Sequence, residues 1–285
     1  MKNISLRSKA AILSTLIFAL ILAVWHFSTL PKAVATQYTP EQIEYMKLMG
    51  KDPAKQTGKS GFPTLSQMGS SIVGHFSDPF YDNGPNDKGI GIQLGHSLAR
   101  VGIGYLLAAL VAIPLGFLIG MSPLIYRALD PFIQVLKPIS PLAWMPIALY
   151  TIKDSTISGI FVIFICSVWP MLINTAFGVA SVRRDWLNVA RTLEVPPLRR
   201  AFEVILPAAA PTILTGMRIS MGIAWLVIVA AEMLVGGTGI GYFVWNEWNN
   251  LSLPNVIFAI LVIGITGMAL DALFAKLQKA VTYVD

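Results

Sequence analysis

Long uncharged runs of apolar residues alternate with short polar segments along the chain. A bilayer core about 30 Å thick requires roughly 20 predominantly apolar residues per helix. Six runs come near this length, so we predict an all-α integral membrane fold with six transmembrane helices. The predicted spans are Ala10 to Leu30, Val101 to Tyr126, Leu129 to Ile152, Ser155 to Val182, Val204 to Val235 and Leu251 to Leu270.

The first run has a second interpretation, because basic residues precede it and the small residues Ala33 to Ala35 follow it. That order is typical of a cleaved signal peptide. Since the apolar stretch is longer than the core of a typical signal peptide, we favour an uncleaved transmembrane helix over residues 1–30.

Basic residues predict the orientation, because positive charges concentrate in cytoplasmic loops. Six spans then place both termini and the connection between the fourth and fifth spans in the cytoplasm. The residues concerned are Lys2, Arg7 and Lys9 before the first span, and Arg183, Arg184, Arg191, Arg199 and Arg200 in the connection.

Residues 31–90 then form an external polar segment, and residues 91–285 form a five-helix core. We expect an amphipathic turn around Ile43, Met46 and Met49. The stretch FPTLSQMGSSIVGHF predicts a short surface helix that Thr64 or Ser66 caps.

Composition supports a membrane protein, since 55% of the residues are hydrophobic and only 13% are charged. We attribute the formal charge of +6 to cytoplasmic loops and lipid headgroups rather than to nucleic-acid binding. The single cysteine, Cys166, and the scattered histidines form no catalytic or metal-ligand pattern. The sequence GGTGIG at Gly236 to Gly241 lacks the Lys-Ser or Lys-Thr of a phosphate loop. We therefore expect no enzymatic activity and no cofactor in this chain.

Proline and glycine mark two of the spans. Pro138, Pro141 and Pro146 predict a third span that is bent and buried against its neighbours, as in a helix that lines a pathway. Gly116 and Gly120 predict close helix packing in the second span.

The basic segment NVARTLEVPPLRRAFEVILP, Asn188 to Pro207, predicts two short cytoplasmic helices. We expect Asp185 to cap the first helix, the Pro196-Pro197 pair to end it, and the second helix to lead into the fifth span. Trp186, Val189 and Leu193 form an apolar stripe on the first helix. A loop that only anchors to headgroups would explain the arginines but not this stripe, so we favour a docking element for another protein.

The spacing of this segment resembles the cytoplasmic loop of ABC-transporter permeases, in which Glu-Ala-Ala, Gly, Ile and Leu-Pro recur at fixed intervals. The corresponding residues are Asn188, Val189 and Ala190, then Glu194, then Val204, and finally Leu206 and Pro207. The chain from Ala10 onward, apart from a polar piece near Gln37 to Gly61, is similar to the permease branch that imports nitrate, bicarbonate, cyanate, sulfonates and taurine. That polar piece and the Asn-Val-Ala variant of the loop most resemble cyanobacterial nitrate/nitrite and bicarbonate permeases.

The resemblance implies a type I ABC importer fold in the inner membrane. It implies a second permease copy, two ATPase subunits that hold ATP and Mg²⁺, and an external solute-binding protein. The carried solute is then a small inorganic anion, with nitrate or nitrite preferred over bicarbonate, cyanate or sulfonates. The residues expected to couple to the ATPase are Asn188, Val189, Ala190, Arg191, Glu194, Pro196, Arg199 and Arg200. Because Glu194 replaces the glycine that permits a turn, we expect Pro196 and Pro197 to supply the bend.

Candidate pathway residues lie in the third, fourth and fifth spans. They are Trp144, Met145, Asn174, Thr175, Arg218 and Glu232. A charge inside a bilayer costs about 2.5 to 3.5 kcal/mol, so Arg218 and Glu232 must face protein or water. For Arg218 both anion attraction and an inter-helix hydrogen bond to a carbonyl or to Asn174 are possible, and for Glu232 a structural or gating contact is preferred. An ATP-independent transporter or channel subunit is the alternative class, although the chain shows no convincing internal repeat.

Overall fold

The computed structural model describes residues 5–30, 62–84 and 86–281. Within these ranges the regular structure is helical, and one isolated antiparallel bridge joins Asp82 and Lys88. The expected turn around Ile43 and the possible cleavage site at Ala33 to Ala35 lie outside the described residues. The helices are α1 (Leu6–Thr29), α3 (Leu65–Ser77), α4 (Ile90–Met121), α5 (Pro123–Leu136), α6 (Pro141–Ile152), α7 (Ser155–Ala180), α8 (Arg184–Thr192), α9 (Pro197–Arg200), α10 (Leu206–Val235), α11 (Ile240–Asn249) and α12 (Leu253–Val281).

The chain divides into two compact units, and the first contains α1, α3 and the start of α12 up to Phe258. Helix α3 begins with reciprocal capping bonds, since the Gln67 amide donates to the Thr64 hydroxyl at 3.4 Å and the Thr64 amide donates to Gln67 Oε1 at 2.9 Å. The Ser71 hydroxyl of α3 donates to Asn255 Oδ1 at 2.7 Å. The short helix predicted here, and its cap at Thr64, are confirmed.

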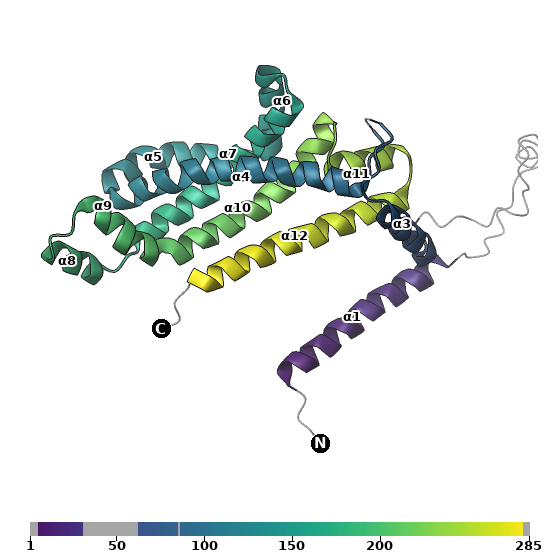
Figure 1. Ribbon diagram of the computed structural model, residues 1–285, viewed down its shortest axis with the longest axis horizontal. Coiled ribbons are helices and arrows are strands. Elements are labelled where there is room, and N and C mark those ends of the chain that lie inside the picture. The colour runs from purple at the N-terminus through teal and green to yellow at the C-terminus, as the bar shows by residue number, and fades with distance from the viewer. Residues whose placement is uncertain (1–4, 31–61, 85, 282–285) are drawn as a thin grey trace, which may run out of the picture. The chain divides into compact units, whose positions relative to one another are not determined.

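The second unit contains α4 to α11 and α12 from Ala259 onward. Helices α4, α7 and α10 run side by side, and α8 and α9 lie beyond one end of them (Figure 1). Glycine permits the contact of α4 with α7, because a Cβ on Gly116 would lie 2.7 Å from the Leu172 carbonyl oxygen and one on Gly120 would lie 2.6 Å from that of Ala176. The prediction of close helix packing at these glycines is confirmed.

The predicted third span is two helices, α5 and α6, which meet at an angle of 90°. Pro141 begins α6 and Pro138 lacks the amide that a continuous helix would use, so the break lies where the prolines predict it. Among the residues described, five apolar helices are therefore long enough to span a membrane, or six if this bent pair counts as one span. The expected burial holds only in part, because Pro138 and Pro146 are exposed in the isolated chain.

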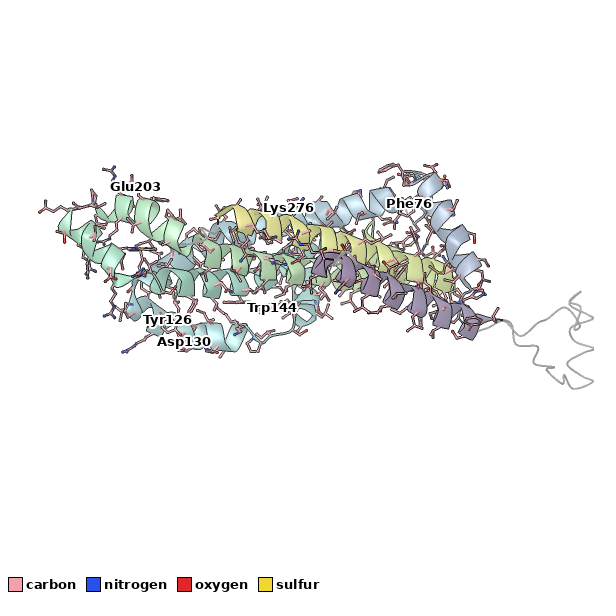
Figure 2. The ribbon with its side chains drawn as sticks, turned by 90° about the horizontal axis from the view of Figure 1, so that it is seen from below. Phe76, Tyr126, Asp130, Trp144, Glu203 and Lys276 are labelled. Atoms are coloured by element: carbon pink, nitrogen blue, oxygen red, sulfur yellow. The ribbon has the colours of Figure 1, made fainter. Side chains whose placement is uncertain are left out.

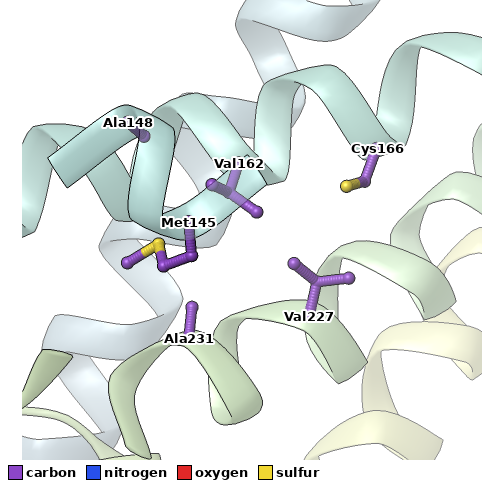
Figure 3. Packing of buried hydrophobic residues seen from close by; sticks show 6 residues of the cluster. All are labelled: Met145, Ala148, Val162, Cys166, Val227 and Ala231. Atoms are coloured by element: carbon purple, nitrogen blue, oxygen red, sulfur yellow. The ribbon is translucent and has the colours of Figure 1, made fainter. Parts of the chain in front are cut away.

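Burial on α6 is confined to one face, which packs between α7 and α10. Met145 and Ala148 of α6 meet Val162 and Cys166 of α7, and Val227 and Ala231 of α10 complete this cluster (Figure 3). The side chain of Met145 is only 2% exposed. The short helix α6 is thus fixed to the long helices through apolar contacts.

Two predicted spans are longer than the uncharged runs that define them. Helix α4 begins at Ile90 rather than Val101, and α12 continues to Val281 rather than ending at Leu270. The extensions contain Arg100 and Asp271, and both of these charges have partners in the second unit. Helix α4 also ends at Met121 rather than Tyr126, because Ser122 caps a new helix that begins at Pro123.

Candidate translocation pathway and coupling surface

A cavity of about 410 Å³ lies beside the α5–α6 break, halfway along α7. It is lined by Trp144 of α6 and Asn174 of α7, two of the predicted pathway residues. Lys137, at the end of α5, is the one charged residue of this lining. The other lining residues are Ile139, Pro141, Ile165, Cys166, Trp169, Pro170, Ile173 and Ile223.

A second cavity, of about 450 Å³, lies between α4, α5 and α7 and shares Lys137 and Ile173 with the first. Its lining includes Tyr126 and Asp130 of α5. Figure 2 shows Tyr126, Asp130 and Trp144 along one edge of the helices, whereas Lys276 lies on the opposite edge. Lys137 thus stands where the two cavities adjoin.

Four of the six predicted pathway residues line neither cavity, and Met145 and Thr175 are two of them. Met145 belongs to the apolar cluster between α6, α7 and α10. Thr175 is fully buried where α7 contacts Gly116 of α4, and its hydroxyl has no partner within the described residues. In this conformation both side chains pack between helices, and Met145 also borders a gap of about 10 Å³ beside Glu232.

Glu232 lies in a buried polar cluster at one end of α10. Its carboxylate accepts hydrogen bonds from Arg100 Nη1 at 2.8 Å, from the Ser97 hydroxyl at 2.8 and 2.9 Å, and from the Gly241 amide at 3.0 Å. Arg100 also donates to the Thr238 carbonyl at 2.7 Å. Helices α4 and α10 are therefore joined by an ion pair that is almost completely shielded from solvent, and the Gly241 amide joins α11 to the same carboxylate.

The loop before α11 completes this cluster with backbone amides. The Gly239 amide donates to Gln93 Oε1 at 2.6 Å, and the Ile240 amide donates to the Ser97 hydroxyl at 2.9 Å. A Cβ on Gly239 would collide with the Glu232 carboxylate. The glycine-rich sequence that could be confused with a phosphate loop thus allows the backbone to approach a carboxylate closely.

Arg218 forms a two-point ion pair with Asp271 of α12, with both N–O distances at 2.6 Å. Asn174 takes no part in it, because its side-chain amide donates to the Pro170 carbonyl at 2.8 Å. The two charged residues of α10 therefore pair with different helices, Glu232 with α4 and Arg218 with α12. The pairing with Asp271 favours the inter-helix role of Arg218, since a neutralised arginine attracts an anion less strongly.

The predicted coupling segment forms two short helices, α8 and α9, followed by one π-helical turn that continues into α10. Trp186, Val189 and Leu193 are 48%, 59% and 71% exposed, so the apolar stripe faces outward. Leu187 on the other side of α8 packs against a buried cluster of α7 and α10. The coupling candidates are exposed except for Ala190, which is buried, and Arg200, which is half-buried.

Two details of this segment differ from expectation. Asp185 is not the cap, because α8 begins one residue earlier and Asp185 instead pairs with Arg183 at 3.5 Å. The bend arises at Glu194, whose φ of 50° is left-handed. The amides of Glu194 and Val195 donate to the carbonyls of Arg191 and Ala190, both at 3.0 Å, which is the bonding of a Schellman motif. Glu194 thus adopts the turn conformation that usually requires glycine, and the prolines only begin the next helix.

Residues 112–283 match the family described as "Binding-protein-dependent transport system inner membrane component". The chain belongs to this family. Nitrate import permease protein NrtB of Synechocystis sp. is 49% identical over 222 residues, which are 78% of this chain and 81% of that protein. Bicarbonate transport system permease protein CmpB of Synechocystis sp. is 46% identical over 204 residues, 71% of this chain and 73% of that protein.

Solved structures place this inner-membrane component among ABC importer permeases by fold. A chain of the inward-facing MetNI methionine ABC transporter aligns with a TM-score of 0.60 and 14% identity, and the alignment covers 66% of this chain and 94% of that one. An amino acid ABC transporter aligns with a TM-score of 0.56. The predicted fold class is therefore confirmed.

Three charged residues of this inner-membrane component were missed as site residues. Arg100 immediately precedes a predicted span, Asp271 immediately follows another, and Lys137 lies inside a third. The signal that could have identified them is a charge that interrupts or borders an apolar run.

Proposed function

We propose that the chain is the membrane-spanning permease subunit of an ATP-driven importer and forms the translocation pathway for nitrate or nitrite. The observation that carries this proposal is an identity of 45 to 50% with three nitrate import permeases over 72 to 78% of the chain. The cavity at the α5–α6 break supports it, because its one charged lining residue is a cation.

Bicarbonate is the second candidate solute. Three bicarbonate transport permeases are 44 to 46% identical to this chain, only slightly less than the nitrate import permeases. Nitrate and bicarbonate are both small anions with a planar arrangement of oxygens, so a cationic cavity suits either one. The choice between them requires a direct comparison of uptake.

The proposed complex contains a second copy of this chain, two ATPase subunits and an external solute-binding protein. The exposed stripe of Trp186, Val189 and Leu193 on α8 supports docking of an ATPase, because an apolar helix face held away from the bundle is suited to a groove in another protein. ATP and Mg²⁺ bind to the ATPase subunits in this proposal, and this chain itself catalyses no reaction.

Uptake by the complete complex tests the function. The permease, its ATPase subunits and its binding protein are reconstituted in vesicles, and uptake of isotopically labelled nitrate is measured with and without ATP. An excess of unlabelled nitrite, bicarbonate, cyanate or taurine is added in turn. We expect ATP-dependent nitrate uptake that nitrite reduces and bicarbonate leaves nearly unchanged. Uptake without ATP would support an ATP-independent transporter, and stronger competition by bicarbonate would make bicarbonate the solute.

A further inference from the structure

Lys137 is a cation with no partner halfway through the helical bundle. Its side chain forms no ion pair or hydrogen bond with any residue that the structure describes. The cavity beside it is lined by Ile165 to Asn174 of α7, a helix that extends from Ser155 to Ala180. At 1.5 Å per residue this stretch lies roughly 15 to 30 Å along the helix, near the middle of a bilayer.

A lysine at this depth cannot face lipid hydrocarbon, because a charge there costs about 2.5 to 3.5 kcal/mol or more. Yet Lys137 is exposed in the isolated chain. The surface around it must therefore face water or protein, and the two adjoining cavities are the space available for water. Two cations of the long helices differ from Lys137, since Arg100 of α4 is paired with Glu232 and Arg218 of α10 with Asp271.

The break between α5 and α6 explains how the lysine reaches this position. Lys137 is the C-cap residue of α5, and the chain turns by 90° between this residue and α6. The nearest acidic residue that lines these cavities is Asp130, seven residues earlier and so roughly 10 Å away along α5. Asp130 lines the second cavity only and accepts a hydrogen bond from Gln134 at 3.3 Å. The first cavity, walled by Trp144, Trp169 and Asn174, therefore has a net positive character.

We propose that Lys137 is the selectivity-determining cation of the translocation pathway, which attracts a small oxyanion into the cavity beside Trp144, Trp169 and Asn174. This inference rests on the proposed function for the identity of the anion, but the positive charge that Lys137 brings to the cavity does not depend on it. Lysine and arginine side chains serve the same purpose in anion pores. Trp144 and Trp169 bound the anion with apolar surface, and Asn174 is the one residue of this lining with a side-chain amide.

The field of Lys137 can be measured without knowledge of the solute. In a Cys166→Ala background, which removes the single native cysteine, Asn174→Cys provides a thiol in the cavity lining. The rates of its modification by a negatively charged and a positively charged thiosulfonate reagent are compared in the complete complex. We expect the anionic-to-cationic rate ratio to fall at least about fivefold in Lys137→Met and to recover in Lys137→Arg. Lys276→Met, on the opposite edge of the helices, is the matched control and leaves the ratio unchanged (Figure 2).

Transport is measured in parallel on proteins that keep the native Cys166 and Asn174. For Lys137→Met we expect kcat/KM for nitrate uptake to fall at least tenfold, with co-purification of the ATPase subunits unchanged, and for Lys137→Arg we expect most of it to be retained. A rate ratio that Lys137→Met leaves unchanged would overturn the proposal, as would unaltered uptake by that variant. If the wild-type complex takes up no nitrate while the rate ratio still depends on Lys137, the proposed solute fails and the cationic cavity stands.

Discussion

The buried pair of Arg100 and Glu232 allows a quantitative test of what holds this inner-membrane component together. Glu232 is 3% exposed, and the side chain of Arg100 is 11% exposed. Replacing Glu232 by Leu leaves the guanidinium buried, with only the Thr238 carbonyl as its acceptor. Removing one partner of a buried ion pair costs roughly 3 to 5 kcal/mol, because the other charge remains without compensation.

The size of the effect in a thermal assay follows from the length of the chain. A loss of 1 kcal/mol lowers the unfolding temperature by roughly 2 to 4 °C for chains of 150 to 250 residues. We therefore expect Glu232→Leu and Arg100→Met each to lower the unfolding temperature of the purified complex by roughly 6 to 20 °C. The measurement is the fraction of complex that remains intact on gel filtration after heating in detergent.

The double variant Arg100→Met with Glu232→Leu decides whether the pair acts as a unit. It leaves no uncompensated charge, so we expect it to be more stable than either single variant, with a coupling free energy of roughly 2 kcal/mol or more. The pair of Lys88 and Asp82, whose side chains are 21% and 51% exposed and lie outside the coupling segment, is the control. Its removal changes the unfolding temperature by less than about 2 °C. Losses in the double variant equal to the sum of the two single losses would refute the reasoning.

Two further predictions concern backbone conformation and helix packing. Glu194→Gly removes the steric cost of the left-handed conformation at the end of α8, and we expect amide exchange in α8 to slow about fivefold, a gain of about 1 kcal/mol. Glu194→Ala removes the charge but keeps a side chain and gives no such protection, so equal protection in both variants would contradict this account. Gly116→Ala places a methyl group 2.7 Å from the Leu172 carbonyl oxygen and costs roughly 1 to 3 kcal/mol in unfolding free energy. Gly102→Ala on the same helix, where nothing lies within 4 Å, causes no loss in the same thermal assay, because alanine has the higher helix propensity, and equal losses in both variants would refute the packing argument.

The apolar pattern predicted five of the six spans as single long helices in the right order, because a helix must satisfy its own backbone bonds to cross a bilayer. The remaining one, the predicted third span, is the bent pair α5 and α6. Proline positions also predicted the bend after Lys137. The turn at Glu194 could not be predicted, since a glutamate rarely adopts a positive φ and only the surrounding Schellman bonds hold it there. The absence of the turn glycine at position 194 led to the prediction that Pro196 and Pro197 supply the bend, although the fixed φ of proline suits the start of a helix better.

Charges explain the remaining errors, because an uncharged run is too strict a criterion for a helix inside a protein bundle. The second predicted span began only at Val101 because Arg100 precedes it, yet Arg100 lies within α4 and is neutralised by Glu232, which is distant in the sequence. The sixth stopped before Asp271 for the same reason, although that carboxylate meets Arg218. Pairing of this kind depends on which helices are neighbours, and that information is absent from a one-dimensional pattern. The same consideration makes Lys137 informative. Arg100 and Arg218 each have a carboxylate within 3 Å, whereas Lys137 has none among the described residues. Its position therefore favours an anion that passes through the membrane as its partner.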